Sequence, residues 1–78
     1  MMNRKYMYQF DNFVKELLND NRVQYDNGSV VAKHIETGTE KGYFYTVPLA
    51  PSKGVVYANT NKIILTEKGK VYAEFLML

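Results

Sequence analysis

The apolar side chains between residues 6 and 20 recur every three or four positions, and this periodicity is the strongest structural signal in the 78-residue chain. Such a spacing places apolar side chains on one face of an α-helix and polar side chains on the other. The run Asn19-Asp20-Asn21 favours turns, because its side chains compete for backbone hydrogen bonds. The pattern predicts an amphipathic helix over 6–20, with these residues facing a core: Tyr6, Phe10, Phe13, Val14, Leu17 and Leu18.

The composition excludes several classes of protein. The chain has no Cys, so disulfide scaffolds, thiolate metal sites and cysteine nucleophiles are excluded, and its seven Tyr and four Phe have to supply the bulk of a small core. No apolar run approaches the roughly 18 residues of a membrane span, and no signal peptide pattern stands at the start. We expect one cytoplasmic domain over residues 1–78, with no membrane contact and no cofactor.

The segment after the predicted helix fits two local structures. In the first, residues 23–25 and 30–32 are the strands of a β-hairpin that turns at Asn27-Gly28. An Asn-Gly pair between alternating residues is typical of a type I′ turn. Local chemistry slightly favours this hairpin, because two adjacent β-branched residues, Val30 and Val31, carry little helix propensity.

The second structure for this segment is a short helix. Ser29 is then the N-cap, residues 30–36 form the helix, and Gly38 closes it. Both alternatives remain open from the sequence alone.

Residues 38–65 carry strand and turn signals. The segment 38–42 is a turn region, and residues 43–47 are dense in aromatic and β-branched side chains, which taken alone favours a strand. Two prolines follow. Residues 55–57 and 62–65 then predict a β-hairpin whose polar tip is Ala58-Asn59-Thr60-Asn61.

The C-terminal segment predicts a helix over about 67–77. Thr66 is a candidate N-cap, and Glu67 places an acid in the first turn, where it complements the helix dipole. Val71, Phe75 and Leu78 fall at helical spacing. The competing structure is a hairpin that turns at residues 67–69.

Enzyme motifs are nearly absent. His34 is the only histidine and has no serine or cysteine close in sequence that would make it part of a catalytic triad. Glu36 and Glu40 are separated by Gly38, which argues against a shared helical face for a carboxylate pair. No phosphate-binding glycine motif is present. The sequence therefore favours a binding module over an enzyme, with no catalytic residue and no metal site.

Two short motifs frame the predicted hairpin. Lys53-Gly54 precedes it, and Leu65-Thr66-Glu67-Lys68-Gly69 leads from it into the predicted C-terminal helix. This arrangement resembles winged helix-turn-helix proteins, in which a Lys-Gly pair ends the recognition helix, two strands form a wing, and Leu-Thr-x-x-Gly leads into a last helix. The resemblance covers residues 53–76. It implies an α+β, winged-helix-like fold with a helix at about 6–20, a wing at about 55–65 and a closing helix at about 67–77.

The alternative fold is an N-terminal helix packed on a four- or five-stranded antiparallel sheet. Under the winged-helix resemblance, the chain is a small DNA-binding regulator of transcription that binds double-stranded DNA. Contacts with phosphates and bases are then implied for a recognition segment and for the wing tip. The candidate residues are Lys41, Tyr43, Tyr45, Ser52 and Lys53 in the first group, and Asn59, Asn61 and Lys62 in the second.

A second functional hypothesis comes from a different class. The short chain, its formal net charge of only +2, the aromatic residues 43–47 and the missing catalytic set also suit a protein-binding inhibitor or adaptor of the kind that viruses and mobile elements encode. A third is a structural domain that assembles with copies of itself through an edge strand, as a homodimer. A clear negative dependence of nucleic-acid affinity on salt would favour the DNA-binding hypothesis.

Overall fold

The computed structural model describes residues 8–50, 54 and 59–78, and within these ranges it shows three helices and three strands. Their arrangement is α+β, as the sequence predicts. In chain order the elements are α1 (Phe10–Glu16), β1 (Arg22–Tyr25), α2 (Val30–Glu40), β2 (Phe44–Pro48), β3 (Asn59–Leu65) and α3 (Glu67–Leu76).

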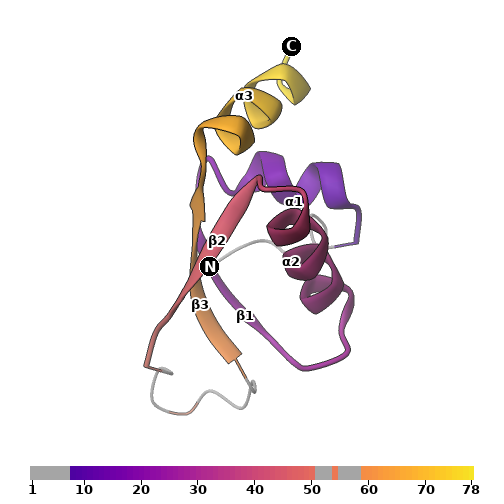
Figure 1. Ribbon diagram of the computed structural model, residues 1–78. Coiled ribbons are helices and arrows are strands. Elements are labelled where there is room, and N and C mark those ends of the chain that lie inside the picture. The colour runs from indigo at the N-terminus through magenta and orange to yellow at the C-terminus, as the bar shows by residue number, and fades with distance from the viewer. Residues whose placement is uncertain (1–7, 51–53, 55–58) are drawn as a thin grey trace.

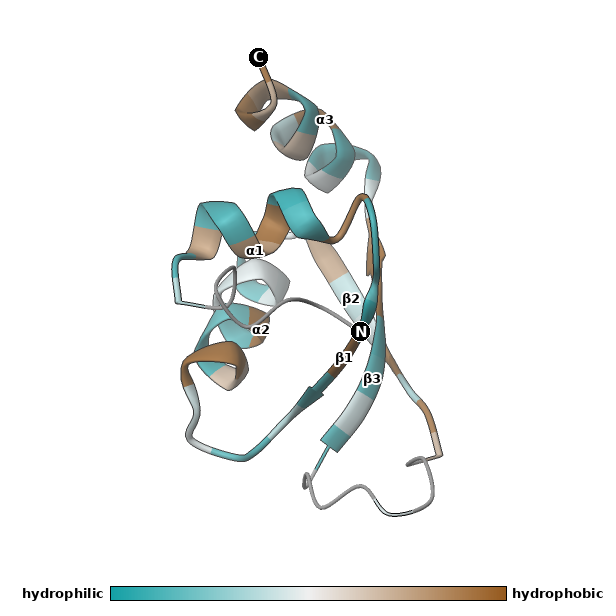
Figure 2. Ribbon diagram, turned by 180° about the vertical axis from the view of Figure 1, so that it is seen from behind, coloured by the Kyte–Doolittle hydropathy of each residue, from teal (hydrophilic) through white to brown (hydrophobic). Residues whose placement is uncertain are grey.

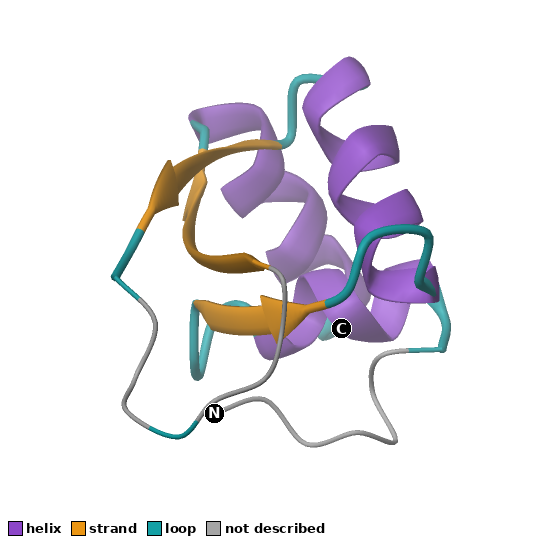
Figure 3. Ribbon diagram, turned by 90° about the horizontal axis from the view of Figure 1, so that it is seen from below, coloured by secondary structure: helices purple, strands orange, loops and turns teal. Residues whose placement is uncertain are grey.

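The three strands form one antiparallel sheet with β3 in the middle, in the order β1-β3-β2. Helices α1 and α2 lie on one side of this sheet, and α3 stacks at one end, beside α1 (Figures 1 and 3). No described element covers the opposite side. The core lies between the sheet and the helices and contains Phe13, Val14, Leu17, Val23, Val31, Ile35, Phe44, Ile63 and Ala73.

The predicted N-terminal helix is confirmed, but it is shorter than its apolar pattern. It ends at Glu16, and residues 17–19 form turns, in which Leu18 N–H bonds to the carbonyl of Lys15. Because the helix has ended, Leu18 is exposed and not part of the core. The predicted residues 6 and 7 lie outside the described residues.

The hairpin favoured for residues 23–32 is wrong, and the helix is correct. Ser29 caps α2, and its hydroxyl accepts a hydrogen bond of 3.2 Å from the backbone N–H of Ala32. The low helix propensity of Val30 and Val31 costs only a few tenths of a kcal/mol each. Burial of Val31 in the core outweighs that cost.

Helix α2 also passes through the glycine predicted to close it. It continues to Glu40, and the chain then turns at Gly42, whose φ of 78° is in the left-handed region. The N–H of Gly42 bonds to the carbonyl of Thr39, and the N–H of Tyr43 bonds to that of Gly38. This pair of bonds is a Schellman motif, for which glycine is the usual residue. Gly38 has a packing role instead, because a Cβ there would overlap the ring of Phe44.

The predicted wing differs from the observed strand pairing. Residues 55–58 lie outside the described residues, but β3 already pairs with β1 on one edge and with β2 on the other. The hairpin of the fold is therefore β2–β3, and the segment predicted as a tip, Asn59–Asn61, belongs to β3. The strand predicted for residues 43–47 is confirmed, because Phe44–Pro48 is a strand, so this part of the predicted recognition segment is not a helix.

Helix α3 confirms the prediction for the C-terminus, and Thr66 fixes its start. The Thr66 hydroxyl accepts a hydrogen bond from the N–H of Gly69 and donates one of 2.6 Å to the carbonyl of Gly42. Gly69 lies so close to the end of α2 that a Cβ would overlap the carbonyl oxygen of Tyr43. The Leu-Thr-x-x-Gly motif thus joins α3 to the turn before β2.

Tyr72 joins α3 to α1. Its hydroxyl donates a hydrogen bond of 2.6 Å to the Asp11 carboxylate. That hydrogen bond, followed by partial burial and the charge of Asp11, raises the pKa of Tyr72 to about 12 from the ordinary 10.0. The folded state therefore favours the protonated phenol, and its stabilising effect is complete below pH 10 and lost as the pH rises towards 12.

We expect Tyr72→Phe to lower the free energy of unfolding by ~1 kcal/mol at pH 7, because the exposed hydrogen bond is lost and the ring is kept. The difference from the wild type should shrink between pH 10 and pH 12. Urea denaturation at several pH values measures both effects. An unchanged difference at pH 12 would contradict the assignment of this contribution to the Tyr72 hydroxyl.

Candidate nucleic-acid interface

The side of the sheet that no described element covers carries side chains that alternate with those of the core. Val23, Phe44 and Ile63 point into the core from the three strands, so their neighbours in each strand point outward. The register places these outward residues in adjacent rows. We call this surface the open sheet face, and it consists of Arg22, Gln24, Tyr45, Val47, Thr60, Lys62 and Ile64.

The open sheet face is cationic. Arg22 of β1 lies directly opposite Lys62 of β3, and both residues are exposed. Like charges opposite each other on a sheet are destabilising. None of the seven residues of the face is acidic, and the nearby Asp20 uses one carboxylate oxygen to accept a hydrogen bond of 3.1 Å from the backbone N–H of Arg22. Such a pair suits the binding of an anion.

An exposed aromatic ring stands beside these cations. Tyr45 is 52% exposed and lies opposite Ile64, while Val47 is 40% exposed and lies opposite Lys62. The ring therefore lies on the same face as Arg22 and Lys62. Aromatic rings of this kind stack on nucleic-acid bases, and neighbouring cations contact the phosphates.

The sequence-predicted site residues do not come together in one place. Tyr45 and Lys62 both lie on the open sheet face, in the neighbouring strands β2 and β3. Lys41 and Tyr43 lie at the turn after α2, where the Lys41 carbonyl accepts a hydrogen bond of 2.7 Å from Lys68 Nζ. Ser52 and Lys53 lie outside the described residues.

The two predicted asparagines make contacts within the protein. Asn61 is only 8% exposed, and its amide donates a hydrogen bond of 2.6 Å to the Tyr25 hydroxyl. Asn59 donates one of 2.8 Å to Oδ1 of Asn27, which ties the turn before α2 to β3. Both side chains therefore stabilise the β1–β3 pair, and Asn61 lies on the core side of the sheet.

Sequence reasoning missed Arg22 and Gln24. A signal was present, because polar residues alternate with apolar or aromatic ones in Arg22-Val23-Gln24-Tyr25. The alternation places Arg22 and Gln24 on one face of a strand. The pairing of that strand with Lys62, 40 positions later, was not available from local pattern.

Helix α2 does not present a comparable cationic surface. Its exposed charged residues are Lys33, Glu36 and Glu40, so acids outnumber bases. Such a helix would carry carboxylates towards the phosphates of a DNA groove, which is unfavourable. The open sheet face is the better candidate for nucleic acid.

The remaining chemistry-bearing residues do not form a second site. His34 lies between the rings of Phe10 and Phe13, with ring centroids 5.7 and 5.5 Å away. Its Nε2 is buried with no hydrogen-bond partner among the described residues, and the same holds for Oγ1 of Thr60. In the described part of the chain, no group of three His, Asp or Glu residues could hold a metal ion. Nor is any helix there long and apolar enough to cross a membrane.

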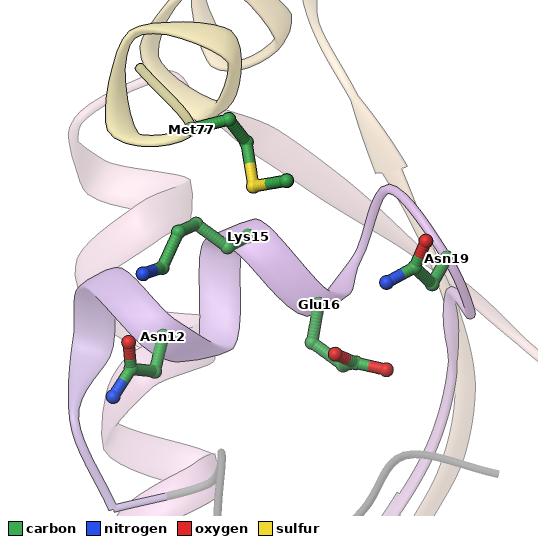
Figure 4. Close-up of a pocket in the computed structure, with 5 residues that line it drawn as sticks. All are labelled: Asn12, Lys15, Glu16, Asn19 and Met77. Carbon is green, nitrogen blue, oxygen red and sulfur yellow. The ribbon is translucent and has the colours of Figure 1, made fainter.

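A hollow of about 230 Å³ lies between α1 and the end of α3 (Figure 4). Met77 reaches towards α1 on one side of it. The polar side chains of this hollow point in different directions and do not converge on a common point, which makes it a poor ligand site. These side chains are Asn12, Lys15, Glu16 and Asn19.

Comparisons with known proteins give no family and no relative for this chain. A scan against protein-family models, a search of curated proteins and a search of solved structures each give no match.

Proposed function

We propose that this chain is a small nucleic-acid-binding regulator that holds the nucleic-acid backbone on its open sheet face. The observation that carries this proposal is the exposed pair Arg22 and Lys62, which are direct neighbours across β1 and β3. Phosphate contacts supply most of the affinity in nucleic-acid binding. Tyr45 then stacks on a base beside them.

We also propose a winged-helix-like architecture, with a different assignment of the motifs. The order of helix, Lys-Gly, two paired strands, Leu-Thr-x-x-Gly and helix is present as α2, Lys41-Gly42, β2, β3 and α3. The Lys-Gly pair of this proposal is thus Lys41-Gly42, not Lys53-Gly54. Only one helix stands between β1 and β2, so the sheet takes the place of a major-groove helix in contacting nucleic acid.

A sheet surface with an exposed ring suits single strands better than a duplex, because unstacked bases are free to stack on the ring. We therefore expect a labelled single-stranded oligonucleotide to bind more tightly than the duplex of the same sequence. Fluorescence anisotropy at several salt concentrations measures both affinities. The logarithm of the affinity should fall with the logarithm of the salt concentration, by ~0.7 for each phosphate contacted on the single strand.

Charge reversal locates the site. We expect Arg22→Glu and Lys62→Glu each to weaken binding at least tenfold, since each replaces an attraction for phosphate by a repulsion. Lys33→Glu makes the same change of charge on the exposed side of α2 and is the matched control. Absence of binding at 50 mM salt would refute the function. If Lys33→Glu lowered the affinity as much as Lys62→Glu, the assignment of the binding site to the open sheet face would be refuted.

A different surface, the exposed side of α3, supports the protein-binding hypothesis. Helix α3 exposes Val71 and Phe75, which lie at the end of the molecule and not on the open sheet face. The two surfaces are separate, so one molecule has room for a protein contact on α3 and a nucleic acid on the sheet.

A further inference from the structure

Helix α3 packs on the body of the protein with one side and leaves an apolar stripe on the other. Its inner side contributes Ala73, which is fully buried, and Tyr72 and Leu76, which pack against the core. The outer side carries Val71 at 59% and Phe75 at 66% exposure. The C-terminal end of α3 is brown in Figure 2, and the exposed Met77 and Leu78 lie there.

The stripe borders an apolar hollow of about 400 Å³. Lys68, Val71, Tyr72 and Phe75 line it, together with Tyr43 from the turn before β2. The four α3 positions are i, i+3, i+4 and i+7, which is the arrangement that receives one side chain of a facing helix in knobs-into-holes packing.

Internal contacts hold this hollow in shape. The rings of Tyr43 and Tyr72 are stacked, with centroids 4.6 Å apart and planes 4° from parallel. Lys68 Nζ lies 5.3 Å from the centroid of the Tyr43 ring and donates a hydrogen bond to the Lys41 carbonyl. The walls are therefore formed before any partner arrives, which lowers the entropic cost of binding.

We propose that the occupant of this hollow is Phe75 of a second copy of the chain. The hollow and the exposed Phe75 ring lie on the same side of one helix, so two copies related by a two-fold axis exchange them reciprocally. In this arrangement the two α3 helices run antiparallel, and Val71 of each copy contacts Phe75 of the other. The contact is isologous, as in most closed dimers.

The charges of α3 favour a copy of itself as the partner. Glu67 and Glu74 balance Lys68 and Lys70, so two α3 helices meet without net repulsion. The open sheet face, by contrast, is cationic and would repel its own copy. Because α3 lies at one end of the molecule, a dimer formed there leaves both open sheet faces uncovered (Figure 1).

The first test is the mass of the protein in solution. Sedimentation velocity between 5 and 500 µM should show the wild type moving towards twice the 9.0 kDa of one chain. Phe75→Glu should keep the mass of one chain over the same range, since its carboxylate would enter an apolar hollow. Val30→Glu is the matched control, because Val30 is a 43% exposed apolar residue at the start of α2, and it should leave the dimer unchanged.

The second test is the antiparallel arrangement. The chain has no native cysteine, so the variants Val71→Cys and Phe75→Cys each carry one thiol. Under mild oxidation, an equimolar mixture should give a share of the mixed disulfide that exceeds the share expected from random pairing of the two variants. A wild type that stays monomeric at 500 µM would overturn the proposal. So would a dimer that survives Phe75→Glu, or a mixture without preference for the mixed disulfide.

Discussion

Replacing Gly69 by alanine should lower the free energy of unfolding by ~3 kcal/mol, the upper end of the usual cost of overpacking, with no helix-interior gain to offset it because Gly69 stands in the first turn of α3. A Cβ at this position would overlap the carbonyl oxygen of Tyr43. That carbonyl is held in place, because it accepts a hydrogen bond of 2.9 Å from the backbone N–H of Thr66. Relief of the overlap requires α3 to separate from the start of β2.

Thermal unfolding followed by circular dichroism at one fixed protein concentration measures this effect. For a domain of this size, the loss corresponds to a fall in Tm on the order of 15 °C. The control is Lys70→Ala, which changes an exposed neighbour in the same helical turn and should stay within ~0.5 kcal/mol of the wild type. A Gly69→Ala protein as stable as the Lys70→Ala protein would show that Gly69 of α3 is not held in close contact with the Tyr43 carbonyl.

Gly38→Ala should cost ~2 kcal/mol. The added methyl group overlaps the ring of Phe44, which is only 2% exposed and packs against Phe13. The overpacking cost of ~3 kcal/mol exceeds the gain of ~1 kcal/mol that alanine brings to a helix interior. The sign of the effect is therefore opposite to that expected for an ordinary helix position.

Two further variants separate packing from helix propensity. Thr39→Ala, at an exposed position next in α2, should be neutral or slightly stabilising. The double variant Gly38→Ala with Phe44→Leu should lose less stability than the sum of its two single variants, because the shorter side chain makes room for the methyl group. Additive losses would count against a direct contact between these two residues.

Local sequence predicted the helices where the signals lie within one element, and it misled where a residue packs against another element. The apolar spacing of α1, the Thr66 cap and the Ser29 cap were all visible, because these signals act over three or four residues. Gly38 resembled a helix stop because its real partner, Phe44, belongs to another element. Its small size serves packing, and only the tertiary structure shows that.

The strand partner predicted for residues 62–65 differs from the observed partners for a similar reason, because pairing depends on tertiary structure. Residues 43–47 and 62–65 each carried a strand signal, but the sequence suggested that 62–65 paired with its nearest neighbour, 55–57. The structure pairs β3 with β2 and with β1, so its contacts span longer stretches of chain. Local patterns identify strands far better than they identify partners.

Only part of the candidate site could be predicted from the sequence, again because strand pairing brings its residues together. Tyr45 and Lys62 were expected near nucleic acid as parts of a recognition segment and a wing tip, and the sheet brings them to one face by another route. Arg22 joins them only because β1 pairs with β3. A cationic face assembled from three strands has no contiguous signature in the chain.

Mapping of backbone amide shifts by NMR, on titration of a single-stranded oligonucleotide, tests the proposed function most directly. We predict that the largest shifts cluster on β1, β2 and β3, at residues of the open sheet face such as Arg22, Tyr45 and Lys62. We predict small shifts on the exposed side of α2, around Lys33 and Glu36. The largest shifts on α2 and none on the sheet would contradict the account.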